Sequence, residues 1–218
     1  MSTTLLSAKT RTFRPKKIDV EGTKGYQLRR FAEATLGSGS LREAVKLPEG
    51  EDEDEWLASN AVDFYNQINM LYTAITEFCT RAECPIMKAG DAYEYLWQDN
   101  DDPSFRRPTE MSAPEYIDHL LAWVRRHIDN DDIFPCKIGV AFPANFRTLV
   151  GQIARRLFRV YAHMYCHHFR IVVALGEEAH LNTSFKHFVL WAREFGLIEE
   201  KEYAPVAELI DGMLASDA

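Results

Sequence analysis

The sequence predicts an all-α protein, a bundle of helices with at most one small β-hairpin. Several long segments repeat apolar residues at steps of three and four, which is the spacing of one helical face. Two segments begin with residues typical of helix N-termini. The chain has 218 residues, of which 46% are hydrophobic, and this fits a single domain with a substantial core.

The first long helix is expected from about Glu53 to Phe78. Trp56 lies one residue, hence about 100°, from the leading edge of its apolar stripe. Two places for the indole stay open: beside the core, or exposed next to the acidic residues that precede the helix. The stripe itself is predicted to face the core and consists of Leu57, Ala61, Phe64, Ile68, Leu71 and Ile75.

A short region of strand and a second helix are expected next. Residues 92–97, AYEYLW, can form a small hairpin. Three residues indicate the start of the helix after it: Ser112 is an N-cap candidate, Pro114 lies in the first turn, and Glu115 completes a capping box. It should end near residues 129–132, DNDD.

Three further helices complete the expected bundle. One runs from about Phe146 through the histidine-rich segment, and its apolar stripe consists of Val150, Ile153, Leu157, Val160 and Met164. The residues NTSF at 182–185 can cap another, which ends at Gly196, and a last helix spans about Pro205 to Leu214. No internal repeat is visible.

The net charge of −8 conceals a strong segregation of charge. Residues 1–30 carry eight Lys or Arg against two acids, a balance of +6, and lack apolar periodicity, which is typical of a flexible arm. Six of the seven residues in 49–55 are acidic, whereas residues 133–176 carry six Lys or Arg and no acid. Each patch can be solvated surface, but three of them favour at least one charged partner.

The cysteines are interpreted in the light of the expected compartment. No segment approaches the roughly 20 apolar residues that span a bilayer, and the start lacks the apolar run of a secretory signal. An intracellular location is therefore expected, where four cysteines favour metal ligands or free thiols over disulfides. Cys136 and Cys166 are interpreted as small buried side chains.

Two split pairs of residues have the chemistry of zinc ligands: Cys79 with Cys84, and His163 with His168. His163 and His168 differ by about 140° on an ideal helix, whereas His167 shares a face with His163 more naturally. Both spacings occur in zinc sites, so the second imidazole stays open; a helix distortion or an early helix end would let His168 serve. The alternative is that these are ordinary histidines. A four-ligand site would be closed and structural.

Arg155, Arg156 and Arg159 form a basic stripe on the helix that begins near Phe146. Their guanidinium groups can hold a phosphate by charge-assisted hydrogen bonds, as in a phosphopeptide site. A solvated basic face is the alternative. Nucleic acid is a third interpretation, which the acidic total and the absence of an aromatic-interleaved basic surface disfavour.

The acidic run at 49–55 leads into the first long helix. Acids there stabilise the helix N-terminus through its dipole, and with Trp56 beside them they could also form a surface for a basic helix. Catalysis finds little support, because the sequence contains no HExxH, GxSxG, Walker-loop or kinase signature.

The sequence resembles the Mob family of kinase co-activators over essentially the whole chain, and looks closest to the branch that partners NDR/LATS-type kinases. Long stretches carry the resemblance: AEATLGSGSLREAVKLPEGED (32–52), DFYNQINMLYTAITEFCTRAECP (63–85), RRLFRVYAHMYCHHF (155–169) and HLNTSFKHFVLWAREFGLI (180–198).

The resemblance implies a Mob domain over residues 33–218, preceded by the basic arm of residues 1–32. The implied fold is the Mob fold, a left-handed four-helix bundle with flanking helices, a small β-hairpin and a structural zinc site. The implied zinc ligands are Cys79, Cys84, His163 and His168, which decides against His167.

The resemblance also implies that the chain is a non-catalytic adaptor. It would bind and activate an NDR/LATS-type kinase through the basic N-terminal regulatory segment of that kinase, with Glu51, Glu55 and Trp56 on the receiving surface. Phosphorylated segments of an upstream Ste20-like kinase or scaffold would bind at Arg155, Arg156 and Arg159.

Thr12 and Thr35 match positions that upstream kinases phosphorylate in the family, so their phosphates could loosen a +6 arm that competes for the acidic surface. The expected setting is a Hippo-like or mitotic-exit/septation pathway, in the cytoplasm and also at the nucleus, spindle pole, centrosome or division site. Neither nucleic acid nor membrane insertion is expected.

Two rival interpretations remain. A phocein-type subunit of a phosphatase–kinase assembly is disfavoured by the EDEDEW and Thr35 segments. A zinc hydrolase using His163, His167 and a carboxylate would leave Cys79 and Cys84 without a role.

Overall fold

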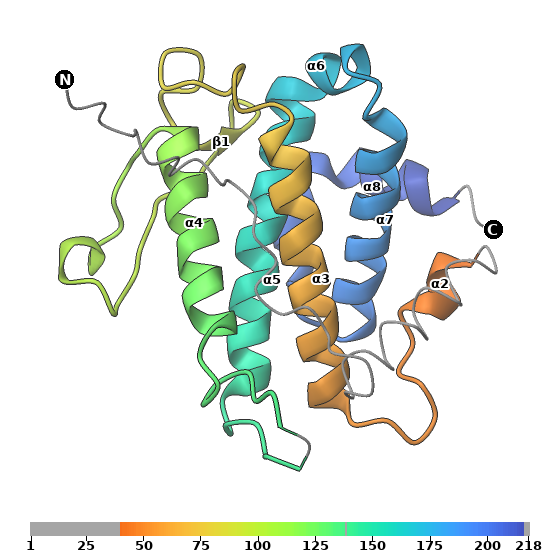
Figure 1. Cartoon of the computed structure of the whole chain (residues 1–218). Coiled ribbons are helices and arrows are strands. Elements are labelled where there is room, and N and C mark those ends of the chain that lie inside the picture. Colours follow the sequence, from red (N-terminus) through yellow and green to blue (C-terminus); the bar gives the residue numbers. More distant parts are fainter. Residues whose placement is uncertain (1–39, 138, 216–218) are drawn as a thin grey trace, which may run out of the picture.

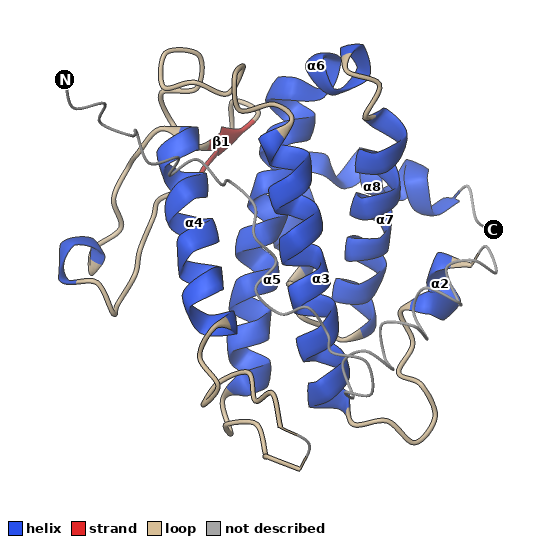
Figure 2. Ribbon diagram, in the orientation of Figure 1, coloured by secondary structure: helices blue, strands red, loops and turns tan. Residues whose placement is uncertain are grey.

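The computed structural model describes residues 40–137 and 139–215, and over these residues the chain is an all-α bundle (Figure 1). Four long helices run side by side, and shorter helices flank them (Figure 2). The predicted fold class is confirmed. The long helices are α3 (Glu53–Thr73), α4 (Ala113–Ile128), α5 (Phe146–His163) and α7 (Glu178–Glu194), and the short ones are α2 (Leu41–Ala44), α6 (Phe169–Ala174) and α8 (Ala207–Ala215).

Helix α5 is the centre of the bundle. It packs along α3 and α4, and its aromatic side chains contact those of α7. The ring centroid of Tyr161 lies 5.2 Å from that of Phe185 and 5.2 Å from that of Phe188. The predicted stripe of α5 is fully buried, with exposed fractions of 0 to 1% at Val150, Ile153, Leu157, Val160 and Met164. Burial of this continuous apolar surface is the main force that holds the helices together.

Helix α3 buries its predicted stripe but ends at Thr73, five residues before the predicted end at Phe78. The Thr73 hydroxyl donates to the Asn69 carbonyl at 2.7 Å, and Thr76 donates to the Thr73 carbonyl at 3.0 Å. The backbone bonds also tighten, since the Ile75 N–H donates to the Tyr72 carbonyl at 3.0 Å. These competing bonds convert the last predicted turn into tight turns.

Trp56 lies in the core, which answers the question that its position on the helix left open. Its side chain is 0% exposed, and its Nε1–H donates to the Val45 carbonyl at 3.1 Å. The indole therefore ties the start of α3 to the segment after α2. It is not exposed beside the acidic residues.

Helix α4 follows its sequence signals. Ser112 caps it, Glu115 completes the capping box, and Asp129 is the C-cap, as predicted. Helix α7 ends as predicted, since Gly196 adopts φ +60 after Glu194.

The predicted start of α7 at residues 182–185 is wrong, because the helix begins at Glu178. Asn182 accepts a 2.8 Å hydrogen bond from the Tyr165 hydroxyl, and Ser184 bonds Tyr161 at 2.6 Å. These side chains thus join α7 to neighbouring segments and do not cap its backbone. The last helix, α8, is preceded by the 3-10 helix η3 (Glu200–Val206), which contains Pro205.

The hairpin exists, but only its second strand falls within the predicted segment. Strand β1 (Lys88–Ala89) pairs antiparallel with β2 (Tyr93–Glu94), and Gly90 at φ +66 makes the turn between them. The chain then continues through the 3-10 helix η1 (Pro103–Phe105). Trp97 pairs with Thr109 in an isolated bridge. We refer to residues 94–108, from the last residue of β2 through η1, as the loop 94–108, and this loop lies against α4 and α5.

Candidate functional site

Four buried side chains meet where the end of α5 approaches the loop after α3. Cys79 Sγ lies 3.5 Å from His163 Nε2, and Cys84 Sγ lies 3.3 Å from His168 Nε2. All four ligand atoms lie within 4.8 Å of one another, and none of the four residues is more than 7% exposed. This is the only such group in the described residues, and it can hold a metal ion.

A widened turn of helix explains why His168 rather than His167 joins the group. Residues Met164–His168 form the π-helix η2 at the end of α5. In a π-helix the bonds run from i to i+5, so residues five apart share a face, which is the spacing of His163 and His168. The helix distortion that the sequence left open is therefore present. The ring of His167 lies beside that of His163, with the two ring centroids 4.9 Å apart, but His167 is not part of the group.

The electrostatics of the group fit metal ligation. His163 Nδ1–H donates to the Lys88 carbonyl at 2.7 Å, which leaves Nε2 as a lone pair facing Cys79. Burial lowers the pKa of His163 to about 4, so the imidazole is neutral at pH 7. Burial also raises the pKa of the Cys79 thiol to about 12. A bound cation would reverse that preference by stabilising the thiolate.

The donor set fits a four-coordinate zinc. In a tetrahedral site the ligand atoms are separated by about 3.3–3.8 Å, given the usual zinc–sulfur and zinc–nitrogen lengths. The two sulfur–nitrogen distances above fall in this range, and the longest separation in the group, up to 4.8 Å, would have to contract by about 1 Å on binding. Four protein ligands leave no open position for water, which is typical of a structural site.

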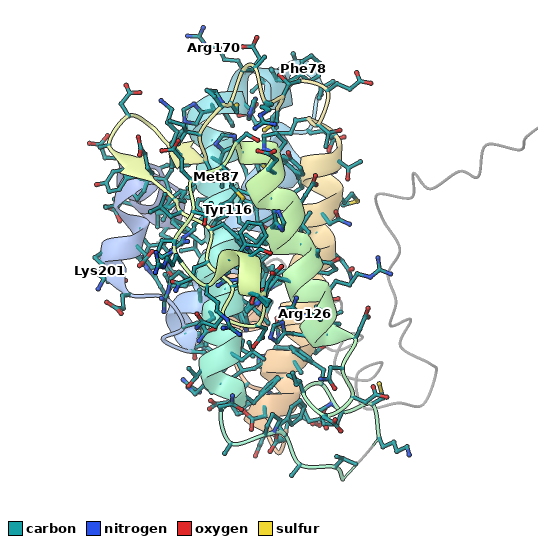
Figure 3. All side chains as sticks on the ribbon, turned by 90° about the vertical axis from the view of Figure 1, so that its left-hand side faces the viewer. Phe78, Met87, Tyr116, Arg126, Arg170 and Lys201 are labelled. Atoms are coloured by element: carbon teal, nitrogen blue, oxygen red, sulfur yellow. The ribbon has the colours of Figure 1, made fainter. Side chains whose placement is uncertain are left out.

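The three arginines singled out from the sequence lie together in a cleft of about 770 Å³ between α4, α5 and the loop 94–108. Figure 3 looks onto this face of the molecule, with Tyr116 near its centre. Arg156 donates to the Gln98 carbonyl at 2.7 Å and stacks over Trp123 at 4.0 Å. Arg159 donates to the Tyr116 hydroxyl at 2.8 Å. The cleft therefore holds its guanidinium groups in fixed positions.

The arginines keep unused hydrogen-bonding capacity. Within the described residues, Arg155 Nε, Arg156 Nη1 and Arg159 Nε are buried and have no partner. Burial lowers the pKa of Arg156, which means that its charge is partly desolvated, although a guanidinium stays charged at neutral pH. Partly desolvated donors with nothing to bind are costly, and an anion in the cleft would satisfy them.

The aromatic residues around the arginines were missed in the sequence. Trp97 and Trp123 flank Arg156, and Tyr95 lies 5.0 Å from Arg159. The sequence indicated no aromatic side chains among the basic ones, and this prediction is wrong, because the fold brings them together. Trp97 and Trp123 are only 1% and 5% exposed, however, so they support the arginines and offer little face to a base. The AYEYLW run was the available signal.

The acidic residues at the start of α3 remain at the surface, with Trp56 beneath them. Asp52 caps the helix by accepting from the Glu55 N–H at 3.1 Å, and Glu53 pairs with Arg147. Glu51 and Glu55 are half-buried. Trp56 was assigned to the same contact surface, but its complete burial means that it supports this surface from below.

An apolar groove lies on the side of α3 that faces α7. It encloses about 530 Å³ between α3 and α7, and Met70, 60% exposed, stands at its edge. Its wall on α7 includes His187, whose buried Nε2 has no partner within the described residues. No sequence signal marked this groove, because it depends on how two distant helices lie together.

Several sequence predictions can be placed or corrected. Cys136 and Cys166 are exposed, so the interpretation of both as buried side chains is wrong. Thr12, Thr35 and the arm of residues 1–32 lie outside the described residues. No helix in the described part of the chain is long and apolar enough to cross a membrane.

The fold and these sites define a class of protein: a helical scaffold with a buried four-ligand group that can hold a metal ion, and with two charged surfaces. The model of the Mob1/phocein family matches residues 33–206, and the chain belongs to that family.

Relatives match over nearly the whole chain. The maintenance of ploidy protein mob1 of Schizosaccharomyces pombe is 60% identical over 204 residues, which cover 94% of this chain and 96% of that protein. MOB kinase activator-like 1 homolog A of Dictyostelium discoideum is 54% identical over 210 residues, covering 96% and 98%. MOB kinase activator-like 1A of Arabidopsis thaliana is 53% identical over 210 residues, covering 96% and 97%.

Proposed function

We propose that this protein is a non-catalytic adaptor that binds and activates an NDR/LATS-type kinase. It receives the basic N-terminal regulatory segment of the kinase and holds it in an active arrangement. Two of the relatives above are named as MOB kinase activators, and the chain matches them almost end to end. The metal centre, with zinc as its ion, acts as a staple and takes no part in chemistry.

The observation that carries the proposal is the concentration of negative charge at the start of α3. Six of the seven residues in 49–55 are acidic, and no basic residue interrupts them. The pKa of Asp54 is raised, first by its partial burial and then by the neighbouring charge of Asp52. A carboxylate that lies close to other negative charges is stabilised when a basic partner arrives.

The groove between α3 and α7 lies further along the same helix and supplies an apolar contact in this proposal. An amphipathic helix binds by placing its apolar face in such a groove, while its charged residues reach the rim. The exposed Met70 provides adaptable apolar contact. A basic helical hairpin can thus use both the acidic start of α3 and the groove further along it.

The arginine cleft serves a second partner, a phosphorylated segment of an upstream kinase or scaffold. Arg155, Arg156 and Arg159 line one cavity, and guanidinium N–H groups suit the three oxygens of a phosphate. The cleft and the kinase surface are built on different elements, so one partner need not displace the other.

Phosphorylation of Thr12 and Thr35 regulates access to the kinase surface in this proposal. The arm of residues 1–32 is basic, so it can cover the acidic start of α3 until phosphates of about −1.5 to −2 charge each weaken its hold. The setting is a Hippo-like or mitotic-exit/septation pathway, in the cytoplasm and at the nucleus, spindle pole or division site.

Calorimetric titration with the basic N-terminal segment of an NDR/LATS-type kinase tests the proposal. The expected result is binding that weakens as salt rises, because exposed charges are screened. The variant Glu51→Gln/Glu55→Gln should bind about 3- to 10-fold more weakly, the range for two exposed charge pairs.

A matched control removes two acids elsewhere. Glu208→Gln/Asp211→Asn changes the net charge equally on the exposed side of α8 and should bind as the wild type does. Absence of binding by the intact chain and by a chain that starts at Ala32 would contradict the proposal and favour the phocein-type role.

A further inference from the structure

The wall of the arginine cleft that faces α5 is acidic. Glu94 and Asp101 lie on the loop 94–108, both are exposed, and both line the same cavity as the three arginines. The cleft is therefore bipolar, with cations on the helix side and carboxylates on the loop side. The loop lies in direct contact with α5, because Arg156 donates a hydrogen bond to the Gln98 carbonyl at 2.7 Å.

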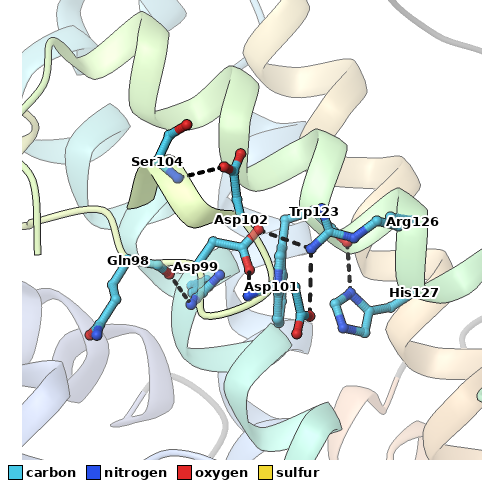
Figure 4. Close-up of polar contacts among 9 residues, drawn as sticks. Gln98, Asp99, Asp101, Asp102, Ser104, Trp123, Arg126 and His127 are labelled. Carbon is cyan, nitrogen blue, oxygen red and sulfur yellow. Dashed lines mark hydrogen bonds and ion pairs between the residues drawn. The ribbon is translucent and has the colours of Figure 1, made fainter. Parts of the chain in front are cut away.

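One acid on this wall is already used for structure, which separates it from the other two. Asp99 is 5% exposed and accepts hydrogen bonds from Arg126 at 2.9 Å and from the Asp101 N–H at 3.0 Å, as Figure 4 shows. Burial opposes its charge, but these bonds outweigh burial and lower the pKa of Asp99. Asp99 thus fixes the loop, and its main partner is Arg126.

Asp101 and Glu94 are less engaged in the structure than Asp99. The Asp101 carboxylate lies 3.8 Å from Arg126, a longer contact than that of Asp99, and is 73% exposed. Glu94 forms no ion pair with any residue that the structure describes. Beyond the cleft, Glu199 and Lys201 near Arg155 pair with each other at 2.6 Å, so they contribute little net charge.

A second, independent observation concerns the aromatic residues of this wall. Tyr95 and Trp97 lie on the same stretch as Glu94 and line the cleft, and they are 9% and 1% exposed. Tyr95 Oη and Trp97 Nε1 are buried and lack a hydrogen-bond partner in the part of the chain described. Buried polar atoms without partners are rare in folded proteins, and here both belong to residues that line the cleft.

We propose that the cleft selects phosphopeptides that carry a basic residue within one to three positions of the phosphorylated residue, with Glu94 and Asp101 receiving the basic side chain. The inference rests on the proposed phosphopeptide function of Arg155, Arg156 and Arg159. The spacing follows because the two walls are close, since Arg156 of α5 itself bonds the Gln98 carbonyl of the loop. An extended chain advances about 3.3–3.6 Å per residue, so a peptide with its phosphate on α5 reaches the loop within a few residues.

The test is fluorescence anisotropy of the intact protein with labelled phosphothreonine peptides of otherwise neutral sequence. Three peptides carry lysine, alanine or glutamate at the second position on each side of the phosphothreonine, and each has an unphosphorylated counterpart. The lysine peptide should bind about 3- to 10-fold more tightly than the alanine peptide, the range for two exposed charge pairs. The glutamate peptide should bind more weakly than both.

Variants assign the preference to the wall. Glu94→Gln/Asp101→Asn should keep phosphate-dependent binding but lose most of the preference for lysine. Glu208→Gln/Asp211→Asn, with the same change in net charge, should retain it. Equal affinities for the three phosphopeptides, or an undiminished preference in the first variant, would overturn the inference alone. Affinities that do not depend on the phosphate would overturn the proposed phosphopeptide function as well.

Discussion

Trp56 holds the start of α3 from inside the molecule. Its fully buried indole donates to the Val45 carbonyl, so it fixes the helix that carries the acidic residues. Replacement by alanine would leave a large cavity and an unpaired carbonyl, at a cost of about 3–5 kcal/mol for a buried aromatic residue. Loss of partner binding in that variant would report a damaged fold. For this reason Glu51 and Glu55 are the informative residues at this surface.

His187 is the clearest case of a single residue that couples stability to pH. It is 8% exposed, and its ring packs edge-on against Phe64 with centroids 4.9 Å apart. Burial lowers the pKa of His187 to about 4, whereas an unfolded histidine titrates near about 6.5. Between these values the unfolded chain binds a proton that the folded chain does not, so the contribution of His187 is complete above pH 6.5 and is lost as pH falls.

We therefore predict that His187→Gln reduces the acid sensitivity of the protein. Between pH 7.5 and pH 5 the wild type should lose about 2 kcal/mol more free energy of unfolding than the variant. Urea denaturation at the two pH values measures this difference. His180→Gln, at an exposed position on the same helix, should behave like the wild type. An equal loss in the wild type and His187→Gln would contradict the assignment.

The π-helix η2 is the element that decides the metal centre. A regular α-helix would bring His167 to the face of His163, whereas the wider turn of Met164–His168 brings His168 there. Such widened turns are frequent at functional sites. Here the turn places His163 Nε2 and His168 Nε2 beside the two cysteine sulfurs.

This element predicts opposite behaviour for two neighbouring histidines. His168→Ala should lose most of the metal that co-purifies with the wild type, about one ion per chain, and should melt at a lower temperature. His167→Ala should keep both. Elemental analysis by mass spectrometry and thermal denaturation measure the two effects. Retention of metal by His168→Ala together with its loss in His167→Ala would show that the π-turn does not select the ligand.

At the scale of elements, the sequence predicted helices better than their boundaries. Periodicity places the buried stripes of α3 and α5, and Ser112 with Glu115 places the start of α4, because these depend on neighbours along the chain. The predicted start of α7 is wrong because Asn182 and Ser184 bond to tyrosines of another segment. The predicted end of α3 is wrong because threonine hydroxyls at its end bond to backbone carbonyls. The groove and the bipolar cleft could not be predicted, because both require non-local packing.

At the scale of the whole molecule, the metal centre and the bundle reinforce each other. The four ligands join residues 79–84 to residues 163–168, so the ion would fasten the loop after α3 to the end of the central helix α5. The acidic start of α3 and the α3–α7 groove then lie on one rigid framework, and the arginine cleft is built on α4, α5 and the loop 94–108. Such a framework suits an adaptor, whose surfaces must keep a fixed relation to each other.

The most direct test of the adaptor function is the activity of an NDR/LATS-type kinase, containing its N-terminal segment, as this protein is added. Phosphorylation of a peptide substrate should rise to a saturating maximum with the wild type and with Glu208→Gln/Asp211→Asn. Glu51→Gln/Glu55→Gln should require about 3- to 10-fold more protein for the same rise, in line with its weaker binding. A kinase whose activity is unchanged at concentrations that saturate binding would contradict the account.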